Sequence, residues 1–370
     1  MENDMRSAAM WSGIISDADY VGRYIRDLRS CPNEGLSSAL AFCATPYFSL
    51  AMYESLQKMQ ALDSRILAAL DPDVVAIATR SRHSLKLFED TKRGIDGQLS
   101  YFRERVIASH SERFLGGMPS LIRFLGTDLG LGGYAGRIIM TSHSATFHVG
   151  FEPDKLLAKD SGSYILEVYR QYGLFFGGLG ATLDDQGAET FVTSLDSQGF
   201  EPRNVHAIRY YRSVFNGQGT PDLNAMLTTF QAMLNFATLV VSSGVSRRRV
   251  DYTALKIGFL SLYQVLRSIQ LLLDDPAYGL TSRSVDIANR IVGSEFARQV
   301  VTPGARGFRN TLMHYNLPPK IDISKIDLEV PFFGMVGASF PQHDVASFVQ
   351  MLDQCGASTA ALFEEWAENG

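Results

Sequence analysis

The stretch YTALKIGFLSLYQVLRSIQLLL, residues 252–273, decides the fold. Wound into a helix, it carries apolar side chains on nearly every side, which is typical of a helix buried inside a bundle. In the stretch before it, from Pro221 to Val241, apolar residues recur three and four positions apart, and Pro221-Asp222 is a favourable helix start. Two successive apolar helices of this kind predict a mainly α-helical, multi-helical protein.

The same spacing recurs over most of the chain, so we expect helix to exceed half of the residues. The helix Ser37–Leu62 should break at Thr45-Pro46, and Pro318-Pro319 should end a helix that covers Ala305–Asn316. The other expected helices are Asp17–Arg29, Asp71–Lys92, one that ends near Phe114, Ser163–Tyr172, Ser284–Val300 and Asp344–Ala367.

Glycines are dense between residues 116 and 200, where the helical pattern weakens. We therefore divide the chain into an N-terminal helical region, 1–115, a glycine-rich irregular region or insertion, 116–200, and a helical bundle with a C-terminal helix, 201–370. With 370 residues, the chain exceeds the size at which single hydrophobic cores usually stop growing, which favours two domains.

Little β-structure is expected. A hairpin or short strand pair is predicted within Arg137–Val149, and Ile321–Phe340 looks extended. Gly130-x-Gly132-x-x-Ala135 shares its letters with a dinucleotide-binding fingerprint. That motif needs a strand before it and a helix after it, and neither is convincing here, so we interpret the match as chance.

The composition, 46% hydrophobic and 20% charged residues, is that of an ordinary globular protein. The net charge of −5 argues against a broad electrostatic footprint for DNA. Three cysteines without a CxxC pair favour reduced thiols. The sequence lacks a signal-peptide pattern and any apolar run near the ~18 residues of a membrane span. We expect a cytoplasmic protein with no membrane partner.

The sharpest chemical signature is Arg309-Asn310-Thr311-Leu312-Met313-His314. On a helix turning by about 100° per residue, Arg309 and His314 lie about 140° apart, with Asn310 between them and Arg306 on the same side. These groups suit RNA cleavage by the substrate's own 2′-hydroxyl, whose proximity the RNA itself supplies. Histidine offers a base near neutral pH, and a guanidinium stabilises the charged phosphorane. No metal or other cofactor is required, and DNA would be excluded.

The motif resembles the R-x(4–6)-H signature of HEPN-family ribonucleases (higher eukaryotes and prokaryotes nucleotide-binding), in which a polar residue usually follows the arginine. The apolar helices from Pro221 onward resemble the family's small α-helical bundle, so the likeness covers about residues 204–319. The resemblance implies a metal-independent endoribonuclease of a toxin or antiviral defence system, with a regulatory protein as a further partner. It implies that Arg309 holds the scissile phosphate, His314 transfers the proton and Asn310 orients either group.

Arg306 and Tyr315 are the expected substrate contacts beside these catalytic residues. A toxin branch of the family places a tyrosine two residues after the histidine, whereas Tyr315 follows His314 directly. This departure puts regulation by modification of that tyrosine in doubt.

Met313 and Leu317 lie on the polar side of the same helix, where an isolated surface helix would not need them. Packing against a second copy would bury them, so we expect a homodimer through the Arg309–His314 helix, with a shared catalytic cleft. Arg247-Arg248-Arg249 could hold an RNA backbone or be a solvated loop. The alternatives for the whole chain are a non-catalytic helical binding or scaffold protein with a coincidental or decayed motif, and an enzyme whose pocket uses the glycine-rich region.

Overall fold

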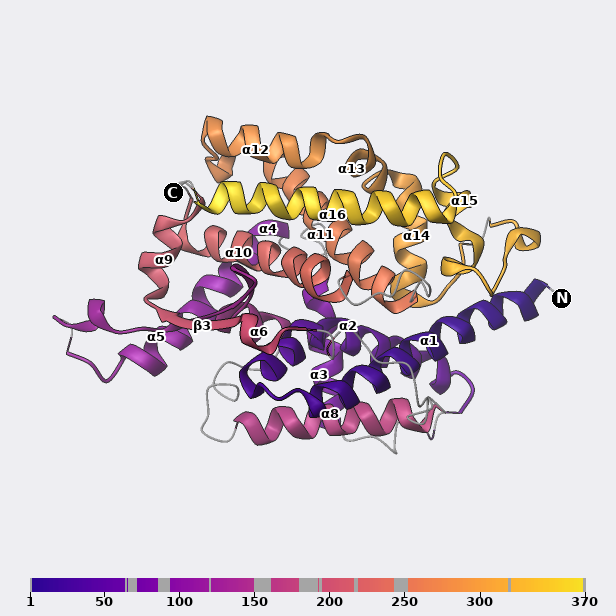
Figure 1. Ribbon diagram of the computed structural model, residues 1–370, viewed down its shortest axis with the longest axis horizontal. Coiled ribbons are helices and arrows are strands. Elements are labelled where there is room, and N and C mark those ends of the chain that lie inside the picture. The colour runs from indigo at the N-terminus through magenta and orange to yellow at the C-terminus, as the bar shows by residue number, and fades with distance from the viewer. Residues whose placement is uncertain are drawn as a thin grey trace.

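The computed structural model describes residues 2–63, 65, 72–85, 94–119, 121–149, 161–179, 192, 195–215, 219–242, 252–318 and 321–368. Most of them are helical, as predicted (Figure 1). The helices of the first half are α1 Glu2–Ser30, α2 Glu34–Gln60, α3 Pro72–Ser81, α4 Gly94–Tyr101, α5 Ala108–Leu115, α6 Ser142–Val149 and α8 Ser161–Gly178. Those of the second half are α9 Ala207–Ser213, α10 Pro221–Asn235, α11 Tyr252–Asp274, α12 Ser282–Gly293, α13 Glu295–Val300, α14 Pro303–His314, α15 Met335–Ser339 and α16 Val345–Glu368.

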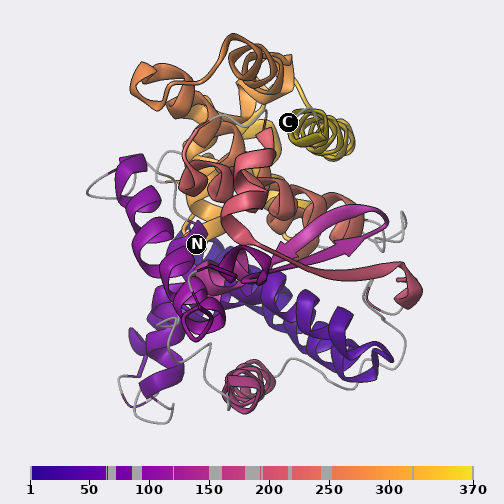
Figure 2. The ribbon, with the colours of Figure 1, turned by 90° about the vertical axis from the view of Figure 1, so that its left-hand side faces the viewer.

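Helices α10 and α11 lie at the centre, which confirms the prediction from their apolar sequences (Figure 1). Helix α10 continues as a π-helix, Phe236–Val241, and every residue of α10 after Pro221 is buried. Along one side run α16, α12 and α13, and along the other run α1 and α2, with α8 outermost (Figures 1 and 2). The buried apolar side chains form one cluster with members from all three sequence regions, from Ala9 to Trp366.

Helix α2 passes through Pro46 without ending, so the predicted break at Thr45-Pro46 is wrong. Proline removes one backbone hydrogen bond and costs about 3 kcal/mol inside a helix. The helix packs against α1, α3 and α6, and its residues from Cys43 to Met52 are buried. This packing outweighs the local cost of the proline.

The strands are β1 Leu129–Tyr134, β2 Arg137–Thr141 and β3 Phe200–Val205. They form a small antiparallel sheet with β1 in the middle, in the order β2-β1-β3. Ala135 and Gly136 join β1 to β2 with φ of 51° and 77°, as a tight two-residue hairpin turn requires. The predicted strand pair within Arg137–Val149 is therefore half right, because residues after Thr141 form α6. The glycine fingerprint falls on β1 and this turn, and β2 follows it instead of a helix.

The segment Ile321–Phe340 is not the extended strand that its sequence indicated. It contains the 3-10 helices Ile323–Lys325 and Pro331–Gly334 and the short helix α15. Phe332 and Phe333 adopt left-handed φ of 57° and are buried. The two rings pack into the helical core, and this burial overrides the local preference of the sequence for extended structure.

Two of the described helices, Glu34–Gln60 and Pro221–Val241, are long and apolar enough to cross a membrane, although the sequence reading expected none. Of their most apolar stretches, 72% and 89% respectively are buried inside the protein. Core helices of soluble proteins have this character, because neighbouring helices cover them on all sides.

Candidate functional site

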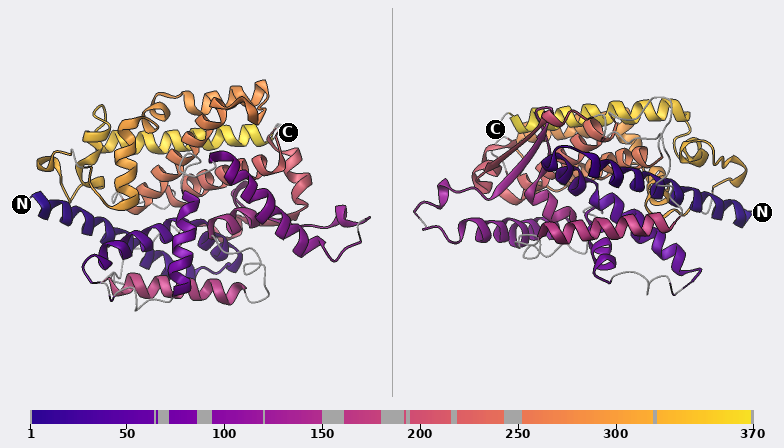
Figure 3. Two further views of the ribbon diagram at one scale, coloured as in Figure 1. Left: turned by 180° about the vertical axis from the view of Figure 1, so that it is seen from behind. Right: turned by 60° about the horizontal axis from the view of Figure 1, so that its bottom comes forward.

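Helix α14 begins with Thr302 as N-cap and Pro303 at its first position, both favourable there. It ends at Tyr315, whose φ of 56° is left-handed. The helix packs against α11, α15 and α2 (Figure 3), and its remaining side, with Arg306 and Asn310, is exposed. Phe308 and Leu312 are fully buried, as their spacing predicted.

Arg309 is only 8% exposed. Its Nη1 donates to Asn310 Oδ1 at 3.0 Å, and its guanidinium lies 5.7 Å from the centre of the Tyr263 ring on α11. Asn310 and Arg306 are exposed, as expected. The open polar face of α14 therefore holds the amide of the motif but not the guanidinium that was expected to hold a phosphate.

His314 lies at the surface with 37% of its side chain exposed. Its Nδ1 is 3.0 Å from Oε2 of Glu54 on α2, a carboxylate that is 9% exposed. Arg82 Nη1 donates to the other oxygen, Oε1, at 3.2 Å, and the Arg82 guanidinium stacks on the Tyr53 ring at 3.7 Å. We call Glu54, Arg82 and His314 the outer cluster.

Glu54 was not identified from the sequence as a residue of the candidate site. A signal was present, because Glu54 stands in the apolar run Leu50-Ala-Met-Tyr-Glu-Ser-Leu56. A carboxylate placed there is buried only at a high cost unless it is paired. Its partners, Arg82 and His314, are distant in sequence, and only the fold identifies them.

Tyr315, the next residue, takes part in a second cluster that is fully buried. Its hydroxyl donates to Oδ2 of Asp17 at 2.5 Å, and Lys256 Nζ contacts the same oxygen at 2.5 Å. Thr253 donates to Asp17 Oδ1 at 2.7 Å. We call Asp17, Thr253, Lys256 and Tyr315 the inner cluster, which joins α1, α11 and the end of α14.

Tyr315 was expected to contact substrate, but its side chain is only 3% exposed and faces the core, so this expectation is corrected. Burial, followed by the negative charge of Asp17, raises the pKa of its hydroxyl well above the usual value. The hydroxyl therefore stays protonated and donates to Asp17. This bond holds Tyr315 in the left-handed conformation that ends α14.

Met313 and Leu317 are buried within the same chain, at 2% and 8% exposure. The argument that they need a second subunit for burial is therefore wrong. Neighbouring residues also bind the N-terminal helices: Lys58 Nζ donates to Asn316 Oδ1 at 2.6 Å, and Arg6 Nη1 donates to the Pro318 carbonyl at 3.1 Å. A homodimer stays a prediction, but the apolar side chains of Met313 and Leu317 no longer support it.

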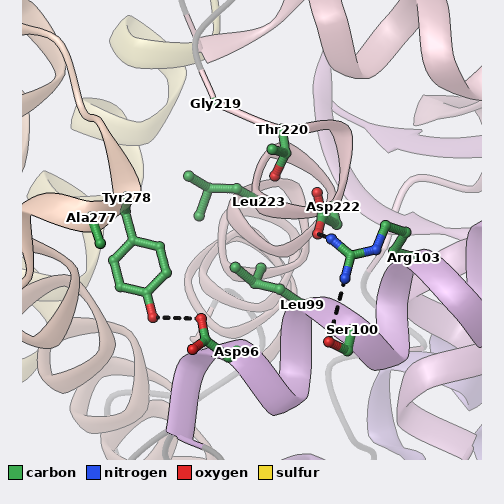
Figure 4. A pocket seen from close by; sticks show the side chains of 10 residues that line it. All are labelled: Asp96, Leu99, Ser100, Arg103, Gly219, Thr220, Asp222, Leu223, Ala277 and Tyr278. Atoms are coloured by element: carbon green, nitrogen blue, oxygen red, sulfur yellow. Dashed lines mark hydrogen bonds and ion pairs between the residues drawn. The ribbon is translucent and has the colours of Figure 1, made fainter.

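A cavity of about 420 Å³ lies where α4 meets the start of α10 and the 3-10 helix Pro276–Tyr278 (Figure 4). Each of its charged side chains has a hydrogen-bond partner among the lining residues. Arg103 Nη1 donates to Asp222 Oδ2 at 3.1 Å, and the Tyr278 hydroxyl donates to Asp96 Oδ1 at 3.0 Å. Burial raises the pKa of Tyr278 to about 12. No residue expected at the active site lines this cavity.

Three buried histidines form a separate group on α5 and α6. His110 Nε2 is 2.9 Å from Thr146 Oγ1, His143 Nδ1 is 3.0 Å from the Tyr211 hydroxyl, and the rings of His110 and His143 contact edge to face. Burial lowers the pKa of all three, to about 4 for His110 and His148. Among the described residues, no group of three or more His, Cys, Asp or Glu could hold a metal ion.

No family model, no curated protein and no solved structure matches this chain. The resemblance to HEPN ribonucleases thus depends on the sequence motif alone, and Arg247-Arg248-Arg249 lies outside the described residues.

Proposed function

We propose that the protein is a metal-independent endoribonuclease in which His314 transfers the proton and Glu54 positions its imidazole. The observation that supports this is the contact between His314 Nδ1 and the nearly buried Glu54 carboxylate. A carboxylate at this nitrogen keeps the hydrogen on Nδ1, which leaves Nε2 as the basic nitrogen. With a third of the side chain exposed, that base is accessible to an RNA 2′-hydroxyl.

The cation that stabilises the phosphorane is the point at which the proposal departs from the family pattern. In the family the motif arginine would supply it, but Arg309 is enclosed against Tyr263. We assign this role to Lys58, which lies one helical turn after Glu54 and reaches Asn316, two residues after His314. Arg309 then supports the packing of α14 and orients Asn310.

The proposal takes RNA as substrate and needs no cofactor. A toxin or antiviral role with a regulatory protein partner, a homodimer and a cytoplasmic location belong to it as well. The motif resemblance suggests the defence role, the regulatory partner and the homodimer, and three cysteines without a CxxC pair favour a reducing compartment such as the cytoplasm.

The test is incubation of the purified protein with mixed RNAs in EDTA. We expect cleavage that leaves 2′,3′-cyclic phosphate ends and spares DNA. His314→Ala should lower the rate by about 10²–10⁴, the usual contribution of a general acid–base group. His343→Ala is the matched control, because His343 is another partly exposed histidine, and it contacts Gln299 and Phe296 away from the outer cluster. Full activity of His314→Ala would reject the site.

A second candidate is a non-catalytic helical binding or scaffold protein. The burial of Arg309 and Tyr315 favours it, because both side chains then serve the packing of α14. Absence of RNA cleavage by the wild-type protein under all RNA mixtures tried would leave this candidate as the better one.

A further inference from the structure

Residues 114–125 carry a concentration of exposed apolar side chains at one end of the molecule. Helix α5 and the segment after it extend beyond the body there, beside the α5 label (Figure 1). We call the five side chains the apolar arm; their exposed fractions are 51% for Phe114, 85% for Leu121, 43% for Ile122, 54% for Phe124 and 68% for Leu125.

The arm is held by its own hydrogen bonds. The amide of Ile122 donates to the Pro119 carbonyl at 3.0 Å, and the amide of Leu125 donates to the Ile122 carbonyl at 2.9 Å. At its base, a Cβ on Gly126 would lie 2.4 Å from a methyl of Leu115, so the chain closes tightly there. The described residues on either side of position 120 present the apolar side chains from hydrogen-bonded turns.

Cationic side chains accompany the arm. Arg123 donates to the carbonyls of Met118 and Gly116 at 3.0 and 3.1 Å, and Arg209 on α9 donates to the Phe124 carbonyl at 3.0 Å. Arg113, which precedes Phe114, and Arg212, three residues after Arg209 on α9, are exposed as well. Within the described part of the chain, none of these four guanidiniums has a carboxylate partner at ion-pair distance. The arm is therefore apolar at its surface and positive beside it.

We propose that the apolar arm docks on an anionic phospholipid surface, with its apolar side chains in the headgroup region and the arginines on the phosphates. Apolar residues flanked by cations bind such surfaces by area burial and charge together. A projecting segment needs no complementary shape in a fluid bilayer. Three of the five side chains are aliphatic, so the arm is poorly suited to stacking on RNA bases. This docking concerns the surface of a membrane and adds no membrane span.

The test is sedimentation of the full chain with vesicles of phosphatidylcholine containing 30% phosphatidylserine, and with phosphatidylcholine alone. We expect binding to the anionic vesicles that weakens as salt is added. Leu121→Ser/Leu125→Ser should reduce the bound fraction on the order of 10-fold. The matched control is Leu166→Ser/Leu174→Ser, which removes two leucines that are 70% and 58% exposed on α8. The control should bind like wild type.

The contribution of the arginines is tested with the double variant Arg113→Gln/Arg212→Gln. It should bind the anionic vesicles more weakly, and its binding should depend less on salt. Failure of the wild type to bind anionic vesicles, or equal loss in the α8 control, would overturn the proposal. Light scattering that shows a wild-type dimer and a monomeric Leu121→Ser/Leu125→Ser variant would assign the arm to a second copy of the chain. Circular dichroism confirms that each variant is folded.

Discussion

Adjacent residues at the end of α14 belong to two clusters of similar chemistry and different surroundings. In the outer cluster, a carboxylate contacts a guanidinium and the imidazole of His314, which is 37% exposed. In the inner cluster, a carboxylate contacts an ammonium and the hydroxyl of Tyr315, all within the core. The comparison teaches that solvent access separates a group able to exchange protons with a substrate from one that fixes the fold.

The largest expected effect is on the inner cluster. Asp17→Asn leaves Lys256 charged and unpaired in the core, so the free energy of unfolding should fall by about 3–5 kcal/mol. Urea denaturation measures this. Asp17→Leu/Lys256→Met should lose less than Asp17→Asn, because no isolated charge stays buried. A loss below about 1 kcal/mol for Asp17→Asn would mean that the inner cluster does not stabilise the fold.

The buried histidines extend the comparison to pH. Their pKa values are lowered in the folded protein, so below about pH 6.5 the unfolded chain binds more protons. Stability should be complete above that pH and fall as pH decreases toward 4, by about 2 kcal/mol for each of His110 and His148 between pH 6.5 and 5. His148→Leu should reduce this slope, measured by urea denaturation across the range. An unchanged slope would show that His148 is not buried neutral.

An intermediate effect is expected at the carboxylate of the outer cluster. Glu54→Gln keeps the size of the side chain but removes the charge that pairs with Arg82 and His314. Stability should fall by about 1–2 kcal/mol, because the Arg82 guanidinium is also mostly buried. If the proposed function is right, the rate of RNA cleavage should fall as well, because Glu54 positions the His314 imidazole. A stability loss as large as that of Asp17→Asn would erase the distinction between the clusters.

The smallest effect on stability is expected at His314 itself. His314→Gln should change the free energy of unfolding by less than about 1 kcal/mol, because its ion pair is partly solvated. Thermal and urea denaturation measure this, with His343→Gln as the comparison. A large destabilisation would identify His314 as a structural residue and weaken the enzyme proposal.

Local sequence determines some features of α14 and not others. Its start, its end before Pro318 and its buried Phe308 and Leu312 follow from local rules on caps, proline and apolar spacing. The helical wheel also placed Arg309 and His314 on one polar side, yet one is enclosed and the other exposed. A helical wheel shows on which side of the helix a residue lies, but not which other helix packs against that side.

By itself, the sequence determined the mainly helical class and the buried pair α10 and α11, because apolar residues on all sides of a helix can be satisfied only inside a core. Only the tertiary structure decided that α2 continues through Pro46, that Met313 is buried within its own chain, and that Glu54 meets His314. Each of these depends on contacts between segments far apart in the chain. Their energies outweigh local preference, and no local pattern encodes which distant segment will supply them.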